Sequence, residues 1–226
     1  MAKRRTTGIQ RRERASAEAM SQRLDAPSAG LPDWRILAIG GVLLAGVILV
    51  ILVLLFSSGP NANAGTTQPD DGTTHITDGA TCRSDPASCG VEGNPYSSTP
   101  GTSGPHWNNP ANWGVYATPQ NESQVIHNLE HGGIIIWYDP EALDAAQVDE
   151  LAQYVTRQVS AGISGRFKFM LSPWDGADPL DAPIVVTAWR NLLELDQVDL
   201  GAIDEFAREH YGRSPEPNGG PGPPSV

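Results

Sequence analysis

Histidine and glutamate gather in one short segment of the chain. His127, Glu130 and His131 fall within five residues, and His106 lies upstream of them, after a turn-like Thr-Ser-Gly-Pro stretch. A neutral imidazole is the commonest metal ligand in proteins, and a carboxylate beside it can bind the same ion or orient a ligand. The sequence therefore predicts a metal site formed by His106, His127, Glu130 and His131. Three imidazoles and a carboxylate suit Cu(II) or Zn(II).

The geometry of this site depends on the secondary structure of residues 122–131. In a helix, His127 and His131 lie one turn apart on one face, with Glu130 beside them. In a strand, the two histidines share one side and Glu130 points to the other. Either structure allows a two-histidine site. Met170 would add a soft ligand that favours copper, but its apolar neighbours indicate a buried strand instead.

The order His-x-x-Glu-His also matches the inverted zinc-peptidase motif, in which two helical histidines hold zinc and the glutamate activates water. Such an enzyme needs a long helix and a third ligand, for which Glu194, Glu205 and His210 are candidates. Gly132 and Gly133 follow the motif directly and would end that helix. We therefore favour a metal-binding domain without catalytic activity over a metallohydrolase.

In a third interpretation the histidines bind no metal. In this interpretation the imidazoles bond backbone carbonyls and Glu130 pairs with Arg190, so that the cluster is only scaffold. The domain would then be an interaction module whose exposed Trp107, Trp113 and Trp174 contact an exported protein partner.

The elements that must position these residues follow from hydrophobic periodicity. Ile134–Tyr138 is a β-branched and aromatic run between turn residues, which predicts a strand. Further strands are predicted at residues 167–171 and 184–189, and helices at residues 140–161, with Asp139 as N-cap, and 200–211. This order predicts an α+β fold with a small mixed sheet and two helices. Residues 90–120 are rich in turn formers and predict an irregular segment pinned by Tyr96, Trp107, Trp113 and Tyr116.

Residues 36–56 form an uncharged run of 21 mostly aliphatic residues. A helix of this length reaches about 30 Å, the thickness of the hydrocarbon core of a bilayer. The sequence therefore predicts one N-terminal transmembrane helix. Residues 62–64, Ala-Asn-Ala, resemble a signal-peptidase site, but the apolar run and its leader are longer than those of a signal peptide, so we favour an uncleaved anchor.

The charge distribution indicates the orientation of this anchor. Residues 1–35 contain eight basic and four acidic residues, whereas the rest of the chain contains seven basic and 22 acidic residues. Basic flanks stay on the cytoplasmic side, which predicts a single-pass cell-membrane protein with a cytoplasmic N-terminus and an extracytoplasmic C-terminal domain. The acidic domain argues against nucleic acid as a partner, because binding to phosphates requires a basic surface.

The remaining chain divides by composition. We expect a basic cytoplasmic segment at residues 1–35, the membrane helix at 36–56, a disordered stalk at 57–79, the α+β domain at 80–212 and a disordered tail at 213–226. The chain has two cysteines, Cys82 and Cys89, on the exported side. Oxidising conditions and the turn residues between them predict a disulfide.

Several motifs of the domain resemble a bacterial family of exported domains catalogued as domain of unknown function 3105. The matching residues are the Thr-Ser-Gly-Pro-His-Trp stretch ending at Trp107, Gly114 to Tyr116, His127 to Gly133 and the strand to Tyr138, then Ser172-Pro173 and Ala188-Trp189. The resemblance covers most of residues 95–192. It implies an anchored, exported domain and directs attention to His106, His127, Glu130 and His131, without implying an activity.

Overall fold

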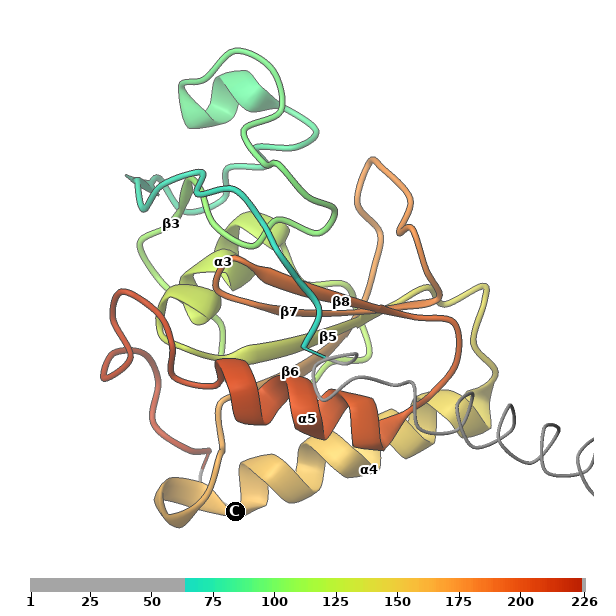
Figure 1. Ribbon diagram of the computed structural model, residues 1–226. Helices are drawn as coiled ribbons and strands as arrows, with labels where there is room; N and C mark the ends of the chain where they lie inside the picture. The colour runs from blue at the N-terminus through green and yellow to red at the C-terminus, as the bar shows by residue number, and fades with distance from the viewer. Residues whose placement is uncertain (1–63, 225–226) are drawn as a thin grey trace, which may run out of the picture. The chain divides into compact units, whose positions relative to one another are not determined.

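The sheet at the centre of the domain is built around strand β5 (Ile134–Tyr138), whose five residues are all buried. The computed structural model describes residues 64–224 (Figure 1). β5 pairs in parallel with β6 (Phe169–Pro173) and antiparallel with β7 (Ile184–Ala188). A strand buried on both faces is expected to be apolar throughout, as β5 is. The sheet has six strands in the order β1-β8-β7-β5-β6-β4 and is mixed, as predicted.

The outer strands are short. β8 (Asn191–Leu195) forms a hairpin with β7, and β1 (Thr66–Thr67) pairs antiparallel with β8 at one edge. β4 (Gly114–Val115) pairs in parallel with β6 at the other edge. Strand β8 was not predicted, because the hairpin turn is Trp189-Arg190 and lacks the usual glycine or asparagine. Arg190 adopts the left-handed conformation there, with φ 58°.

Three α-helices are present among the described residues, one more than predicted. Helix α3 (Glu122–Glu130) lies on one face of the sheet, and α4 (Ala145–Ser160) and α5 (Leu200–His210) lie on the other (Figure 1). α4 starts five residues later than predicted, because Asp144 and Gln147 form a capping box there. Asp139 instead accepts a hydrogen bond from the amide of Glu141 in the preceding turn.

The two segments expected as a stalk and a disordered tail differ from that expectation where the structure describes them. Residues 64–79 contribute β1 and also β2 (His75–Ile76), which pairs in parallel with β3 (His106–Trp107). Residues 213–224 run past the C-terminal end of α3, where the amide of Glu216 donates to the carbonyl of Glu130. Polar contacts to the backbone order both segments, and composition does not reveal such contacts.

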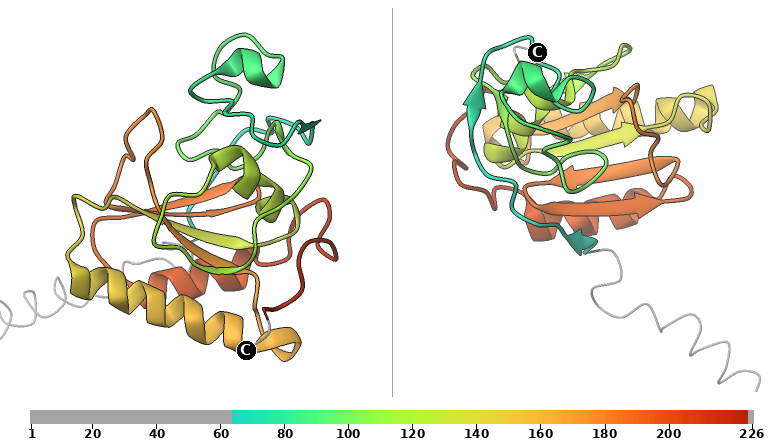
Figure 2. Two further views of the ribbon diagram at one scale, coloured as in Figure 1. Left: turned by 180° about the vertical axis from the view of Figure 1, so that it is seen from behind. Right: turned by 90° about the horizontal axis from the view of Figure 1, so that it is seen from above.

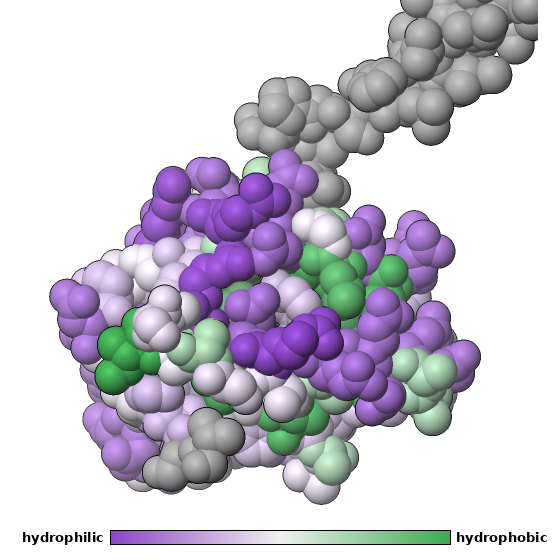
Figure 3. Space-filling view, turned by 90° about the horizontal axis from the view of Figure 1, so that it is seen from below, coloured by the Kyte–Doolittle hydropathy of each residue, from purple (hydrophilic) through white to green (hydrophobic). Residues whose placement is uncertain are grey.

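The predicted membrane anchor, residues 36–56, and the basic segment before it lie outside the described residues. Within residues 64–224, none of the helices has both the length and the apolar character that crossing a bilayer requires. Figure 3 views the domain from the side of α4 and α5, where hydrophilic surface predominates and apolar side chains form small separate patches. Amphipathic helices that bury their apolar stripe on a sheet produce such a surface.

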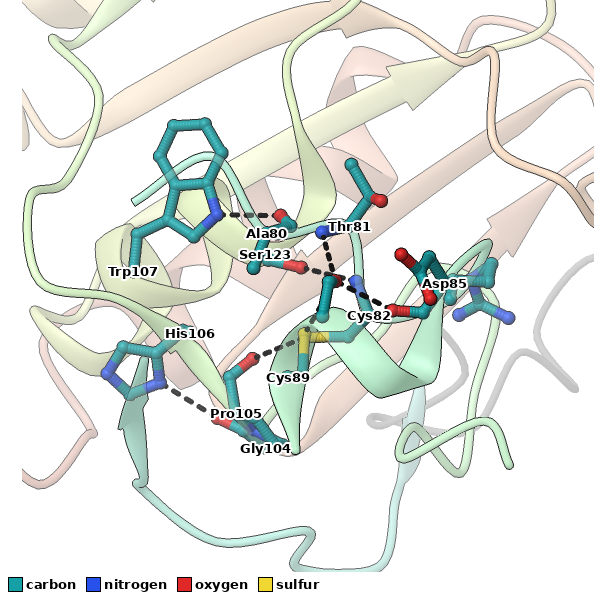
Figure 4. Close-up of a disulfide and its surroundings, with 12 residues drawn as sticks. Ala80, Thr81, Cys82, Asp85, Cys89, Gly104, Pro105, His106, Trp107 and Ser123 are labelled. Atoms are coloured by element: carbon teal, nitrogen blue, oxygen red, sulfur yellow. Dashed lines mark hydrogen bonds between the residues drawn. A yellow bond between two sulfur atoms is a disulfide. The ribbon is translucent and has the colours of Figure 1, made fainter. Parts of the chain in front are cut away.

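The predicted disulfide between Cys82 and Cys89 is present, with Cα atoms 5.4 Å apart. It flanks the short 3-10 helix η1 (Pro86–Cys89). The segment is bonded on two sides: the amide of Cys82 donates to Ser123 Oγ on α3, and Trp107 Nε1 donates to the carbonyl of Ala80 (Figure 4). The disulfide segment therefore ties α3 to the strand that carries His106.

Candidate metal centre

Helix α3 presents His127 and Glu130 in its last turn. Asn121 caps the helix by accepting from the amide of Ser123, and seven of the nine helix residues are buried. The helix ends at Glu130, and His131 is its C-cap. Gly132 follows with φ 79°, and a Cβ there would lie 2.6 Å from the Cα of Gly212. Only glycine fits this turn, which confirms the expectation that the glycine pair stops the helix.

Strands β2 and β3 bring two more histidines to the end of this helix. His75 and His106 are directly paired in the parallel register. The amide of His106 donates to the carbonyl of Thr74, and the amide of Gly104 donates to the carbonyl of Gly72. These bonds hold the segment before β2 against the body of the domain, so the position of His75 is set by the backbone.

Three imidazoles from these elements meet at one point. The ring centroids of His75, His106 and His127 are 4.6 to 5.0 Å apart, and one ligand nitrogen from each lies within 4.8 Å of the others. His106 is fully buried and His127 is 5% exposed, whereas the side chain of His75 is 41% exposed. The cluster therefore has a buried side and a side that faces solvent.

Backbone carbonyls orient the two buried rings. His106 Nδ1 donates to the carbonyl of Gly104 at 2.8 Å, and His127 Nδ1 donates to the carbonyl of Trp107 at 2.6 Å. A carbonyl can only accept, so Nδ1 carries the proton and Nε2 carries the lone pair in each neutral ring. Metal-binding histidines are oriented in this way by their outer partners. Burial lowers the pKa of both rings, that of His106 to about 4, which keeps them in the neutral form that binds metal.

Glu130 lies against the histidine cluster, where its carboxyl oxygen Oε2 faces the lone pair of His106 Nε2. Its Oε2 is 3.1 Å from His106 Nε2 and 3.8 Å from His75 Nε2, and the residue is 2% exposed. Because His106 Nε2 has a lone pair, this short contact requires a proton or another cation between the two atoms. Burial raises the pKa of Glu130, which favours the protonated carboxyl as the donor when no metal is bound. A bound cation would take the place of that proton.

His131 lies one ring further out. Its ring centroid is 4.5 Å from that of His127, but its Nδ1 bonds the backbone carbonyl of Glu216 at 3.1 Å. The three histidines that meet are thus 75, 106 and 127, while His131 flanks them. Of the four predicted site residues, the structure brings His106, His127 and Glu130 together and places His131 next to them.

His75 was not among the predicted ligands, because the residues around it have the composition of a stalk. The only signal was local: four of the five residues of Thr-Thr-His-Ile-Thr, residues 73–77, are β-branched, which is typical of a short strand. Two residues of strand are too few for that pattern to be recognised. Pairing with β3, which could not be predicted, brings His75 to the site.

Other expectations were wrong. Arg190 contacts the carbonyl of Gln68 and the carboxylate of Asp70, and does not pair with Glu130. Trp113 and Trp174 are 3% and 8% exposed, so they belong to the core and form no docking surface. Met170 is fully buried in β6, as the strand interpretation predicted.

The candidate third ligands of a peptidase do not join the histidines in the described part of the chain. Glu194 lies on β8 and Glu205 on α5, and His210 Nε2 donates to the carbonyl of Ala64. The only group of possible ligands found in residues 64–224 is His75, His106 and His127.

A family model described as "Protein of unknown function (DUF3105)" matches residues 89–221. The match covers more than half of the chain, and the chain belongs to this family. It includes His106, His127, Glu130 and His131, whereas His75 lies before its first matched residue. No curated protein and no solved structure matched the chain.

Proposed function

We propose that this protein is a membrane-anchored, extracytoplasmic domain that binds one transition-metal ion through His75, His106 and His127, with Glu130 as a fourth ligand or outer partner. The convergence of three imidazoles from three separate segments, two of them oriented by carbonyls, carries this proposal. A scaffold needs buried polar groups to be satisfied, but it does not need their lone pairs to point at one another.

The donor chemistry suits Zn(II) or Cu(II). Imidazole nitrogen with one carboxylate oxygen is a borderline donor set, and Met170 lies within the core sheet, where it pairs with Ile135 and Gly114. A site of nitrogen and oxygen donors without a thioether favours Zn(II) or Cu(II) over Cu(I). The ligand atoms lie within 4.8 Å of one another, and the solvent-facing His75 is the ligand with most freedom to adjust to an ion.

Binding without catalysis is favoured by the place of Glu130. In a zinc hydrolase the glutamate faces a metal-bound water, whereas the Glu130 carboxyl lies 3.1 Å from the His106 Nε2 that would bind the ion, close enough to take a coordination position itself. The extracytoplasmic location rests on the apolar run and the charge asymmetry of the sequence, and the disulfide supports it.

The test is metal content of the purified full-length chain. Protein loaded separately with zinc and copper, then freed of excess metal, is expected to hold about one ion per chain, as a single closed site requires. His75→Ala, His106→Ala and His127→Ala should each lose the ion, and His210→Ala, which changes a histidine outside the cluster, should retain it. Circular dichroism of each variant checks that the fold survives. Folded wild-type protein without metal would leave the scaffold interpretation in place.

A further inference from the structure

The C-terminal segment of the domain lies across His131. Residues 214–221, called the strap here, run past the end of α3 (Figure 1). The carbonyl of Glu216 holds His131 Nδ1, and the backbone of Gly219 and Gly220 packs on the ring so closely that a Cβ at Gly219 would lie 2.2 Å from it. These two glycines are therefore required for the strap to lie flat on the imidazole.

Few contacts hold the strap. Lys168 Nζ donates to the carbonyls of Pro217 and Gly219 as well as to that of His131, and Trp113 Nε1 donates to the carbonyl of Pro221. The amide of Glu216 donates to the carbonyl of Glu130. Every strap residue is at least partly exposed, and the strap contributes no side chain to the hydrophobic core. A segment held by these polar contacts and by two glycines on one ring opens at a lower free energy than the sheet beneath it.

Under the strap, His131 is placed to reach a metal ion. Its ring centroid is 4.5 Å from that of His127, which is as close as the cluster histidines lie to one another. The bond to the carbonyl of Glu216 fixes this ring, and His131 is not part of the group of possible ligands that His75, His106 and His127 form. Once the strap leaves, Nδ1 loses this partner and the ring is free to rotate about its side-chain bonds.

We propose that His131 is a transfer ligand: the strap holds it out of the metal site, and detachment of the strap lets its imidazole bind the ion together with His127 during exchange. This inference rests on the proposed metal site. It assigns His131 a part in the rate of metal exchange and none in the resting site. A ligand that takes over one coordination position at a time lowers the barrier to release, because the ion need not lose its ligands all at once.

Two truncations of the full-length chain test the strap. A stop codon after Arg213 removes all strap contacts, and a stop codon after Pro221 removes five residues but keeps those contacts. Transfer of bound Zn(II) to the chelator 4-(2-pyridylazo)resorcinol is followed by absorbance. The shorter chain loses five hydrogen bonds between the strap and the rest of the domain and is expected to release zinc at least about tenfold faster than wild type, whereas the longer chain releases it at the wild-type rate. Equal rates of zinc release from all three chains would show that the strap does not control metal exchange.

His131→Ala in the shorter chain separates a ligand from a simple cover. If His131 takes part in transfer, this double change returns zinc release to near the wild-type rate; if the strap only blocks solvent, release stays fast. In the full-length chain, His131→Ala should leave the zinc content unchanged. Zinc content is measured first, so a wild-type chain without zinc overturns the proposed site itself, whereas normal content with rates insensitive to His131 overturns only the transfer role.

Discussion

Two carboxylates at opposite ends of α3, Glu122 and Glu130, have side chains that are only 9% and 2% exposed, but their surroundings differ. At the first turn, Glu122 accepts from Nε and Nη2 of Arg83, each at 2.8 Å, and from the amide of Gly101. The remaining N–H groups of Arg83 reach Asp178, Thr99 and the carbonyl of Ser98. Every donor of this guanidinium has a partner, so the first end of the helix is a complete ion pair.

At the last turn, Glu130 has no such cation. Within residues 64–224 its side chain contacts only imidazoles, those of His106 and His75, and no lysine or arginine pairs with it. Burial of a carboxylate alone therefore does not mark it as a functional residue. A buried charge with a full set of partners stabilises the fold, whereas two acceptors that face one another need a proton between them or, in the proposed site, a metal ion.

The largest expected effect on stability comes from removing the ion pair between Arg83 and Glu122. Arg83→Met should lower the free energy of unfolding by about 3 to 5 kcal/mol, because it leaves the Glu122 carboxylate buried without its partner. Urea unfolding measures this loss. Arg213→Met, which removes an exposed pair with Glu209, is the control and should cost less than about 1 kcal/mol. Zinc content should be unchanged in both variants, and a small loss in Arg83→Met would mean that the two ends are alike.

A smaller effect on stability is expected when zinc binds at the proposed site beside Glu130. Zinc at about 100 times its dissociation constant should raise the free energy of unfolding by roughly 3 kcal/mol, since the site exists only in the folded chain. His127→Ala should abolish this increase. Calcium, which prefers oxygen ligands, is the matched control ion and should have no effect. Equal stabilisation of wild type and His127→Ala would place the zinc elsewhere.

The metal-free cluster should also respond to acid. The pKa of His106 falls from 6.5 to about 4 on folding, so the unfolded chain binds the proton first and stability is lost as the pH falls through this window. The contribution of His106 amounts to about 3 kcal/mol at most. Urea unfolding between pH 7 and pH 4.5 should show a shallower decline in His106→Gln.

Glu130 provides a second test of the acid response, because folding raises its pKa whereas folding lowers that of His106. Its raised pKa means that the folded chain takes up the proton first, which partly offsets the loss due to His106 as the pH falls. Glu130→Gln removes that compensation, so its stability should decline more steeply than that of wild type. Parallel curves for wild type and both variants would show that neither group titrates differently in the folded chain.

The smallest effect on stability, and the most telling, is expected for Glu130→Gln at neutral pH. The glutamine amide can donate to His106 Nε2 as the protonated carboxyl does, so the metal-free protein should change by no more than about 1 kcal/mol. Zinc affinity should nevertheless fall by about ten- to 100-fold, as for other outer partners of metal ligands. Competition with a chelator measures it. Unchanged affinity would show that Glu130 takes no part in binding.

Much of the sheet could be predicted from the sequence, because β5 and the two flanking helices carry strong periodic patterns. Ile134–Tyr138 was located to the residue, and the end of α5 to within one residue. α3 could not be assigned, since nine residues with polar and apolar positions mixed fit a helix and a strand equally well. Its helical form depends on the Asn121 cap and on burial against the disulfide segment.

The candidate site could be predicted only in part, because only some of its residues are close in sequence. His127 and Glu130 are close in sequence, so any local structure keeps them near each other. His75 joins them through strand pairing across a long stretch of chain, and two paired residues leave no trace in composition. The strap likewise has the composition of a free tail, and its order depends on a lysine at position 168 that satisfies three carbonyls.

The long separation of the three histidines along the chain has a consequence for biogenesis. If the proposed site binds metal, a chain still being synthesised has His75, His106 and His127 far apart, and the carbonyls of Gly104 and Trp107 that orient two of them are not yet in place. Such a chain cannot compete for a scarce ion. Metal would be acquired only by chains that have finished folding, so the ion a chain retains would serve as a mark of its maturity.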